Sequence, residues 1–404
     1  MIMANAQIEG TQELLEEAEQ SILFTTVRPG IVMDYGKGMY LWDTDGKKYL
    51  DFIGGWAVTC LGHCPEVMIK ALSEQGSRLI NASPSFWNKP MLRFAKLLTD
   101  HSCFDRVFFA SSGAEANEGA IKLARKYGSV HLEGAYEIIT TVNGFHGRTL
   151  ATMAATGKEK WKSLFEPKAG GFKHVPFNDI HAIQSVISSK TCAIMLEPIQ
   201  GEGGVIVSDE GYIKALRQMC DETGIMLIFD EVQTGVGRTG KLFAYEHYGI
   251  EPDVMTLAKG IGGGFPLSAL LIKEKFNIFE AGDQGGTYSS QPLGMAVGLA
   301  VVNEVIQKEL PKKAEKQGKY IQARLCDIAP KYDLQNIRGK GLLIAFDLPA
   351  DKGGEIVSEC LNHGLILNAP RPNIIRLMPP LIVEEKDIEA MIQILSEVLR
   401  KVLN

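Results

Sequence analysis

Short runs of apolar residues alternate with helix-like segments between about residues 104 and 273. These runs are almost continuously apolar, which is typical of strands in a parallel sheet that is covered on both faces. Segments 114–128 and 210–224 have helical spacing and end at Gly. The pattern predicts an α/β domain whose ligands bind beyond the carboxyl ends of the strands. Strands are predicted at residues 106–110, 136–142, 191–199, 225–232, 253–258 and 267–272.

The two ends of the chain show a different pattern. Residues 36–55 predict short alternating strands joined by a turn at "TDG". Helical spacing dominates from about residue 292 to 328, and the tail combines short strands with a last helix near 385–402. We therefore expect a large domain with a mainly parallel central sheet and a smaller α+β domain from both termini. The expected division is 1–58 (small domain), 59–296 (large domain) and 297–404 (small domain).

Composition excludes several classes of function. The 42 Lys and Arg against 48 Asp and Glu give a net charge of −6 without a basic tract, so neither nucleic acid nor a membrane surface is expected as a partner. The N-terminal segment lacks the features of a secretory signal, and no apolar stretch is long enough to span a bilayer. Seven scattered Cys favour reduced thiols in the cytoplasm. Cys60, His63 and Cys64 lack a second ligand pair nearby, so they are interpreted as packing residues and no metal is expected.

A single lysine ends the apolar run in "TLAKGIGGGFP", residues 256–266, and glycines follow it. Burial lowers the pKa of a lysine and makes its amine a nucleophile toward carbonyl compounds. Taken alone, the segment favours a surface lysine before a flexible loop. Residues at other strand ends make a buried, reactive lysine the better interpretation.

Two further strand ends carry groups suited to a charged ligand. Ser112, Gly113 and Ala114 lie where a helix begins, and backbone N–H groups there can bind a phosphate, although no nucleotide-binding glycine motif is present. Asp230 ends an apolar strand, where a carboxylate needs a cation. The cation could be a protonated ring nitrogen, with Val232 packed on the ring, or an internal Arg or Lys.

Three loops add candidates, each of which could also be an ordinary loop. After strand 136–142, Phe145 could stack on a flat ring and Arg148 could bind a carboxylate. Glu202 lies in a glycine-rich turn after strand 191–199. Gly286 and Thr287 offer a backbone amide and a hydroxyl.

One cofactor, pyridoxal 5′-phosphate (PLP), accounts for all these features together. Lys259 can form a Schiff base with its aldehyde, and Asp230 can keep its pyridine nitrogen protonated. The turn at 111–114 would hold the phosphate, and Phe145 and Val232 would enclose the ring.

From about residue 15 to 400 the chain resembles the class III aminotransferases of PLP fold type I. The match lies in "FDEVQTGVGRTG", followed 29 residues after Asp230 by Lys259. Within that class, "SSGAEANEGAIKLAR", "NGFHGRTLATM", "LEPIQGEGGV" and "IRLMPPL" are most similar to acetylornithine aminotransferases, and next to ornithine and 4-aminobutyrate aminotransferases.

The resemblance implies roles for the residues at matching positions. Lys259 would carry the cofactor and move the proton, Gln233 would contact the phenolic oxygen, and Thr287 would reach the phosphate of a partner subunit in a homodimer with shared sites. Arg376 would bind the α-carboxylate of glutamate, and Glu202 would neutralise it while the other donor is bound. The implied sets are Lys259 and Asp230 for catalysis; Ser112, Gly113, Ala114, Phe145, Asp230, Val232, Gln233, Lys259 and Thr287 for the cofactor; and Arg148, Glu202, Gly286 and Arg376 for substrates.

Two segments depart from the family pattern. "GGTYSSQP" has Gly286 where the common pattern "STFGGNP" has a serine, so its substrate contact can only come from the backbone. "NASPSFWNKP" carries Phe86 and Trp87, which are expected near the substrate mouth.

The expected reaction is transamination of N2-acetylornithine with 2-oxoglutarate, and ornithine, succinylornithine or 4-aminobutyrate is the alternative donor. PLP aminomutases and decarboxylases share this scaffold, but the two arginines and the glutamate favour transamination. A transcriptional regulator would need a DNA-binding domain, for which the first 30 residues are too short and acidic. A nicotinamide dehydrogenase would need a glycine fingerprint that the chain lacks.

Overall fold

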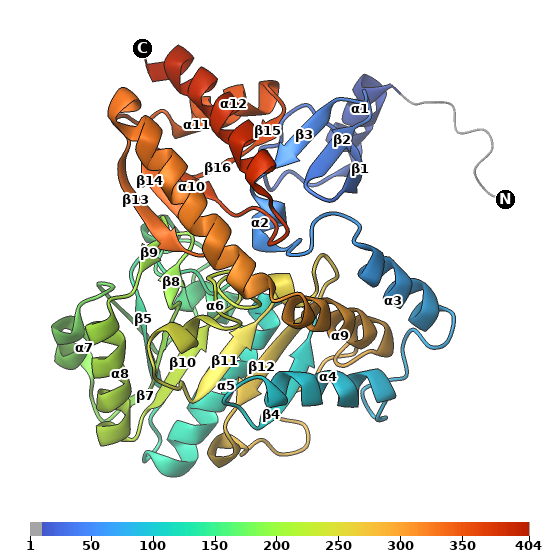
Figure 1. Cartoon of the computed structure of the whole chain (residues 1–404). Coiled ribbons are helices and arrows are strands. Elements are labelled where there is room, and N and C mark those ends of the chain that lie inside the picture. Colours follow the sequence, from blue (N-terminus) through green and yellow to red (C-terminus); the bar gives the residue numbers. More distant parts are fainter. Residues whose placement is uncertain (1–9, 404) are drawn as a thin grey trace.

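A seven-stranded sheet forms the centre of the larger part of the protein, whose computed structural model describes residues 10–403. This sheet lies in the lower half of Figure 1. Its strands are, in spatial order, β4 (Arg106–Ala110), β12 (Ser268–Ile272), β11 (Val254–Leu257), β10 (Met226–Asp230), β7 (Thr191–Leu196), β5 (Glu137–Thr141) and β6 (Phe172–Val175).

The sheet is mainly parallel, as the sequence predicts. β10 runs parallel to β7 and β11, whereas β12 runs antiparallel to both of its neighbours, β11 and β4. The residues just before β12 therefore lie at the same edge as the residues just after the parallel strands. β6, which pairs parallel with β5, is a strand that the apolar pattern did not predict.

Both faces of this sheet are buried, which explains the unbroken apolar runs. In β10, Met226 and Ile228 pack in one hydrophobic cluster, and Leu227 and Phe229 pack in another on the opposite face. All four side chains are inaccessible to solvent. Burial of each such side chain contributes about 1.5–3 kcal/mol, so this strand holds both layers of helices on the sheet.

Helices α5 (Gly113–His131) and α8 (Glu210–Thr223) contribute to the two clusters. α8 ends where predicted, with Gly224 in the left-handed conformation at φ 74°. The prediction that the other helix ends at Gly128 is wrong, because the helix continues to His131. A Cβ at position 128 would lie 2.0 Å from the carbonyl oxygen of Ala135, so this glycine serves close packing instead of ending the helix.

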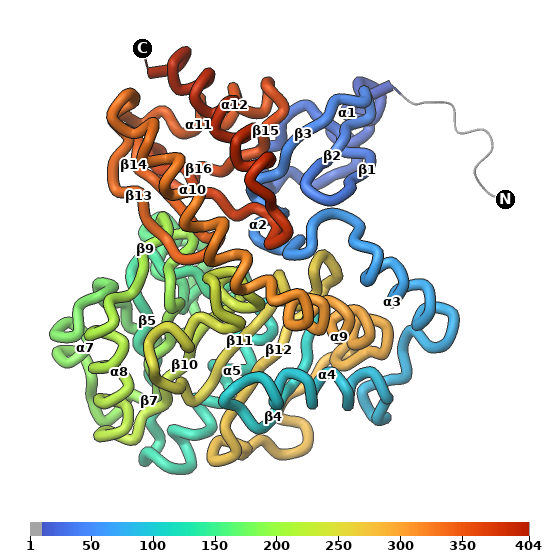
Figure 2. The backbone as a smooth tube through the Cα atoms, viewed as in Figure 1, coloured from blue at the N-terminus to red at the C-terminus, as the bar shows by residue number. Residues whose placement is uncertain are grey.

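Segments from the two ends of the chain form two smaller sheets in the upper half of the molecule (Figure 2). One contains β1 (Met33–Lys37), β2 (Tyr40–Asp43), β3 (Lys48–Asp51) and β15 (Leu365–Ile366), and β15 runs parallel to β3. The other contains β13 (Gln335–Lys340), β14 (Leu343–Asp347), β17 (Ile374–Leu377) and β16 (Asn368–Arg371). The domain boundaries at residues 58 and 297 remain predictions.

The other elements connect and cover these sheets (Figure 1). They are α1 (Thr11–Ser21), α2 (Gly54–Ala57), α3 (Glu66–Gly76), α4 (Lys89–Asp100), α6 (Leu150–Ala155), α7 (Ile180–Val186), α9 (Pro292–Gln307), α10 (Leu310–Tyr332), α11 (Gly353–Asn362) and α12 (Glu385–Leu403), the short 3₁₀ helices η1 (Glu159–Trp161), η2 (Ala244–His247), η3 (Lys259–Ile261) and η4 (Glu274–Phe276), and the ribbon β8 (Ile199–Gln200) with β9 (Ile206–Val207).

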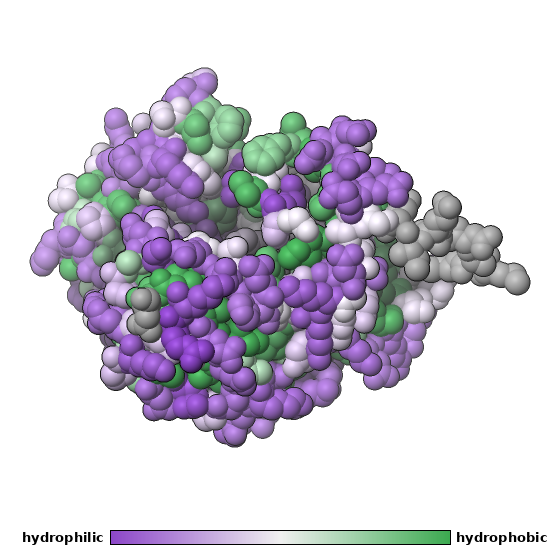
Figure 3. Space-filling model, turned by 90° about the horizontal axis from the view of Figure 1, so that it is seen from above, coloured by the Kyte–Doolittle hydropathy of each residue, from purple (hydrophilic) through white to green (hydrophobic). Residues whose placement is uncertain are grey.

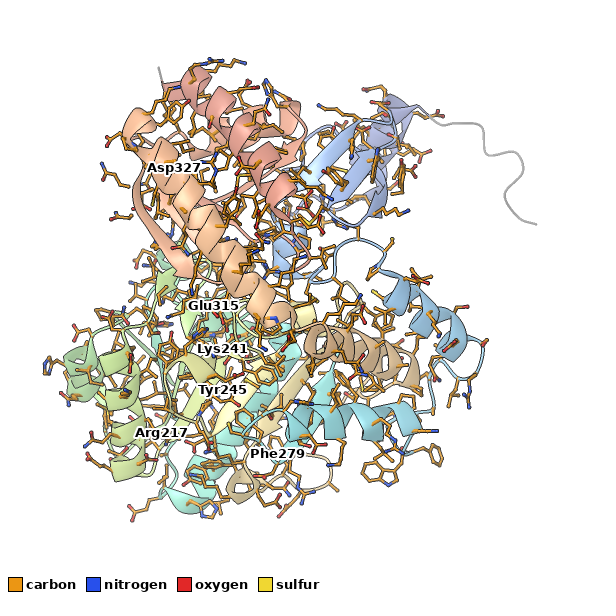
Figure 4. The ribbon with its side chains drawn as sticks, viewed as in Figure 1. Arg217, Lys241, Tyr245, Phe279, Glu315 and Asp327 are labelled. Atoms are coloured by element: carbon orange, nitrogen blue, oxygen red, sulfur yellow. The ribbon has the colours of Figure 1, made fainter. Side chains whose placement is uncertain are left out.

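Polar contacts also tie the outer elements to the sheet, and two of the residues that make them, Arg217 and Tyr245, are labelled in Figure 4. Arg217 on α8 donates to Asp253, just before β11, with 2.9 Å between Nη1 and Oδ2. The hydroxyl of Tyr245 in η2 accepts from the backbone N–H of Cys103 at 3.0 Å. Hydrophilic residues cover much of the face seen in Figure 3, with smaller groups of hydrophobic residues between them. Within residues 10–403, no helix is long and apolar enough to cross a membrane.

Candidate active site

A cavity of about 390 Å³ lies at the edge of the sheet where the parallel strands end. The turns after β4, β5, β10 and β11 line it, and Pro266 and Leu267 reach it just before β12 because that strand is reversed. The cavity brings together Ser112, Gly113, Ala114, Phe145, Arg148, Glu202, Asp230, Val232, Gln233 and Lys259 from the predicted set.

Lys259 enters the cavity immediately after β11, at the start of η3. Its backbone is left-handed, with φ 50°, a conformation that a residue with a side chain adopts only when its surroundings impose it. Its Nζ makes no hydrogen bond to any other described residue. Burial lowers the pKa of this amine and Arg376 lowers it further, while Glu202, Asp230 and Glu197 oppose the shift. The site thus favours the neutral, nucleophilic amine more than water does.

Asp230 is buried at the end of β10, and its partners are polar groups other than Arg or Lys. Its Oδ2 lies 2.8 Å from Nδ1 of His146 and accepts from the side-chain amide of Asn117 at 2.8 Å. Its Oδ1 accepts from the backbone N–H of Val232 at 3.0 Å. An internal salt bridge to Arg or Lys, the alternative considered from sequence, is therefore not formed by the described residues.

Asn117 and His146 form a support for Asp230 that sequence reasoning missed. The Asn117 amide also donates to the carbonyl oxygen of His146 at 2.7 Å and accepts from the hydroxyl of Thr256 at 2.7 Å. Among the described residues, Nε2 of His146 is buried without a hydrogen-bond partner. The sequence did contain one signal: Asn117 lies one turn into the helix that begins at the candidate phosphate-binding turn.

The turn between β4 and α5 presents a helix N-terminus to the cavity. The Ser112 side chain caps the 19-residue helix by accepting from the backbone N–H of Glu115 at 3.3 Å. A Cβ at Gly113 would lie 2.9 Å from Cγ1 of Val232, so only glycine lets this turn approach Val232 so closely. The free backbone N–H groups of the first turn are suited to binding an anion.

A fully buried arginine lies behind two residues of the cavity lining. Arg376, on β17, donates through Nη2 to Oε1 of Glu202 at 2.8 Å and to Oδ1 of Asn368 at 2.7 Å. Its Nη1 lies 3.4 Å from Oε1 of Gln233. Glu202 and Gln233 line the cavity, so Arg376 reaches the cavity through these two side chains.

Glu202 has a second cationic partner that the sequence did not suggest, Lys158. Its Nζ lies 3.1 Å from Oε2 of Glu202. Burial by itself would raise the pKa of Glu202, but Arg376 and Lys158 outweigh burial and lower the pKa to about 2. The carboxylate is therefore ionised at neutral pH.

The neighbouring carboxyl group of Glu197 behaves in the opposite way. It accepts from the backbone N–H groups of Phe145 at 2.9 Å and Gly201 at 3.2 Å. Burial, with the nearby charge of Asp230, raises its pKa to about 7. Glu197 thus ties the loop that carries Phe145 to the turn that leads to Glu202.

Two of the predicted site residues lie away from this cavity. Gly286 is half-buried, Thr287 is in an exposed turn, and neither residue lines the cavity. Phe86 and Trp87 also do not line it, so their place near the substrate mouth stays a prediction. The side-chain amide of Asn88 donates to the carbonyl oxygen of Ser290 at 2.9 Å, which places these two exposed segments side by side.

In the Cys60–Cys64 segment, Cys60 is buried, whereas Cys64 is exposed. The thiol of Cys60 donates to the carbonyl oxygen of Gly260 at 3.2 Å, and Nε2 of His63 lies 2.9 Å from Oδ2 of Asp51. Among the described residues, no group of His, Cys, Asp and Glu is arranged to hold a metal ion.

Comparison with known proteins gives one family over nearly the whole chain. Residues 25–399 match the model of the class-III aminotransferases. The chain is 50% identical over 388 residues to an acetylornithine aminotransferase of Ralstonia nicotianae (94% of this chain, 97% of that protein). It is 46% identical over 376 residues to one of Methanocaldococcus jannaschii (92% and 94%).

Solved structures have the same fold. The ornithine aminotransferase of Toxoplasma gondii superimposes with a TM-score of 0.94 at 28% identity, covering 98% of this chain and 95% of that one. The acetylornithine aminotransferase of Elizabethkingia anophelis gives a TM-score of 0.86 at 31% identity, covering 97% and 99%.

Proposed function

The chain belongs to the class-III aminotransferases, and from this premise we propose that it transfers the side-chain amino group of N2-acetyl-L-ornithine to 2-oxoglutarate. The products are N-acetyl-L-glutamate 5-semialdehyde and L-glutamate, and the reaction is a step of arginine biosynthesis. The observation that carries this proposal is the Glu202–Arg376 ion pair at the wall of the cavity that Lys259 enters. The acetylornithine aminotransferases that match at 42–50% identity support this donor.

The residues around the cavity fit PLP, the cofactor of this family. The turn at 111–114 offers backbone N–H groups to a phosphate, and the missing Cβ at Gly113 leaves room for Val232 beside it. Asp230 offers a buried carboxylate to a protonated ring nitrogen, and Gln233 offers an amide to the phenolic oxygen. Phe145 and Val232 line the same cavity and would cover the ring. When bound, PLP supplies an aldehyde that takes up the amino group and a ring that stabilises negative charge on the substrate carbon.

The protein supplies the proton transfer and the electrostatic field. Nζ of Lys259, once free, removes the proton from the reacting substrate carbon, and its lowered pKa suits it to act as a base. Asp230 keeps a proton on the ring nitrogen, and its hydrogen bonds to Asn117 and His146 hold the carboxylate in place.

Arg148, Glu202 and Arg376 would let one cavity accept two different substrates. Arg148, which lines the cavity, would bind the α-carboxylate of acetylornithine and the side-chain carboxylate of 2-oxoglutarate. Only the keto acid brings a second carboxylate near the reacting carbon. Glu202 neutralises Arg376 while acetylornithine is bound and must move away when the second carboxylate arrives.

Replacing Arg376 by Ala is expected to discriminate between the two half-reactions. Loss of a charge-assisted hydrogen bond to the substrate costs about 2–3 kcal/mol, so kcat/KM for glutamate should fall about 30- to 150-fold. The acetylornithine half-reaction should change less than about fivefold. Single-turnover absorbance measurements of each half-reaction check this, with Arg371→Ala on the neighbouring strand as the matched control. Equal losses in both half-reactions would argue against the Glu202–Arg376 arrangement.

The donor is tested by following single turnovers of the PLP enzyme without keto acid, using acetylornithine, ornithine, succinylornithine and 4-aminobutyrate in parallel. We expect acetylornithine to convert the enzyme at the lowest concentration. A preference for another donor would refute the proposed substrate while leaving the aminotransferase class intact.

We also propose that the enzyme is a homodimer in which Thr287 of one subunit reaches the phosphate in the other. An apolar patch made by Leu79, Ile80, Phe86, Trp87 and Tyr288 supports this, because all five side chains are exposed in the single chain. Thr287 lies in the exposed turn next to Tyr288.

Charging this patch is expected to separate the subunits. Phe86→Asp with Trp87→Asp should shift sedimentation equilibrium from dimer to monomer and lower PLP retention, because each site would lose its contact from the partner. Val130→Asp on α5, at another exposed apolar position, is the control and should remain dimeric. A wild-type protein that sediments as a monomer at micromolar concentration and is fully active would refute the shared site.

A cytoplasmic location is proposed from the thiols. All seven cysteines are unpaired in the structure, which suits a reducing compartment.

A further inference from the structure

Lys158 lies on the opposite side of Glu202 from Arg376, so one carboxylate bridges two cations. Oε1 of Glu202 lies 2.8 Å from Nη2 of Arg376, and Oε2 lies 3.1 Å from Nζ of Lys158. Within residues 10–403, these are the two basic side chains that form salt bridges with Glu202. Arg376 is fully buried, whereas the side chains of Lys158 and Glu202 are partly accessible to solvent.

Two aromatic rings fix the position of the Lys158 ammonium group. Its Nζ lies 4.9 Å from the ring centroid of Phe145 and 5.2 Å from that of Trp161. The two rings pack edge to face with centroids 5.9 Å apart, and Trp161 is buried in η1. Both rings attract the ammonium group through cation–π interactions, which help to hold it beside Glu202.

With two cationic partners, Glu202 still has one cation beside it after it moves away from Arg376. A carboxylate in a partly buried site is costly without a cation nearby. If Glu202 releases Arg376 to a substrate carboxylate, it can keep its contact with Lys158, and both of its oxygens become available to that ammonium group. Without Lys158, release would leave Glu202 without either of the cations that lower its pKa.

We propose that Lys158 is a positioning residue that holds Glu202 after its release from Arg376 and so favours binding of substrates with an α-carboxylate. The inference rests on the proposed transamination and on the exchange of partners at Arg376. Lys158 would act by holding Glu202 and would not contact the substrate itself. Lys158 therefore affects glutamate and 2-oxoglutarate, and has little effect on acetylornithine.

Lys158→Met tests the inference because it keeps the aliphatic chain against the aromatic rings and removes the charge. We expect kcat/KM for the glutamate half-reaction to fall about tenfold, mainly through KM, and the acetylornithine half-reaction to stay within about twofold. The dissociation constant of glutarate, a dicarboxylate that cannot react, should rise by a similar factor in calorimetry on the PLP enzyme. Lys158→Arg keeps the positive charge, so kcat/KM for glutamate and the affinity for glutarate should both stay close to their wild-type values. Lys162→Met, which removes the charge of an exposed lysine paired with Glu159, is the control and should change neither.

A double-mutant cycle shows whether Lys158 acts through Glu202. In a Glu202→Gln background, Lys158→Met should have no further effect on glutamate or glutarate. Additive losses would overturn the inference, because Lys158 would then act on substrate or on the fold directly. Equal losses for glutamate and acetylornithine in the single variant, or no loss for glutamate, would overturn it as well.

The wild-type measurements separate this inference from the proposed function. If the wild type prefers a donor other than acetylornithine, the proposed substrate fails, and Lys158 is tested with that donor against glutamate. If Arg376→Ala reduces both half-reactions equally, the exchange at Arg376 fails, and the role of Lys158 fails with it.

Discussion

Lys259→Ala is expected to lower transamination by at least about 10⁴-fold while the protein stays folded. Lys259 would supply both the covalent link to the cofactor and the base that moves the substrate proton, so one substitution removes two functions. The folded state should not suffer, because Nζ makes no hydrogen bond to another described residue and burial penalises its charge. The variant should therefore unfold at a temperature equal to or slightly above that of the wild type.

Three measurements check this result. Absorbance of the purified variant should lack the band of lysine-linked PLP, and borohydride should attach the cofactor to the peptide containing residue 259 only in the wild type. Thermal unfolding monitors the fold. Lys273→Ala is the matched control, because Lys273 also follows a central strand but pairs with Glu251 at 2.9 Å, away from the cavity lining. Normal turnover of Lys259→Ala would refute the assignment of this lysine.

Asp230→Asn is expected to lower kcat by about 10²–10³-fold while retaining much of the bound PLP. The substitution keeps the size of the side chain but removes the negative charge that holds a proton on the ring nitrogen. A loss of two to three pKa units for that nitrogen corresponds to about 3–4 kcal/mol, which matches the expected loss in rate. The Asn side chain can still accept one hydrogen bond from Asn117 or His146, so the site should keep its shape.

The control for this prediction is Asp253→Asn. Asp253 is also buried but lies just before β11, where it pairs with Arg217, at the opposite end of that strand from Lys259. We expect this variant to lose stability and to keep its rate per folded molecule. The two variants are compared by single-turnover rates and by thermal unfolding. A rate for Asp230→Asn equal to that of the wild type would contradict the proposed role.

The apolar pattern was sufficient to predict most strands of the central sheet, because strands buried on both faces consist mainly of apolar residues. β10 illustrates this, since consecutive side chains enter opposite clusters. β6 escaped prediction because its "FKHV" contains two polar residues at the edge of the sheet. The direction of β12 also could not be predicted, because burial depends on which faces are covered and is the same for either strand direction.

The sequence by itself determined which residues at strand ends are candidates for the proposed chemistry. Lys259 and Asp230 stand at the ends of apolar runs, where the cost of burying charge makes a polar residue conspicuous. Strand order then brings β10 and β11 side by side, so both residues reach one cavity. The sequence pattern alone can identify such residues, because each is a charged residue directly after a run of apolar ones.

Only the tertiary structure decided which groups support those residues. His146, in the loop after β5, and Asn117, on α5, contact Asp230. Lys158 and Arg376 meet Glu202 from segments more than 200 residues apart. Lys158 does not interrupt an apolar run, so nothing local distinguishes it from the other lysines of the chain. Hydrogen bonds and ion pairs act over a few ångströms in space, and only the folded chain brings these partners within that distance.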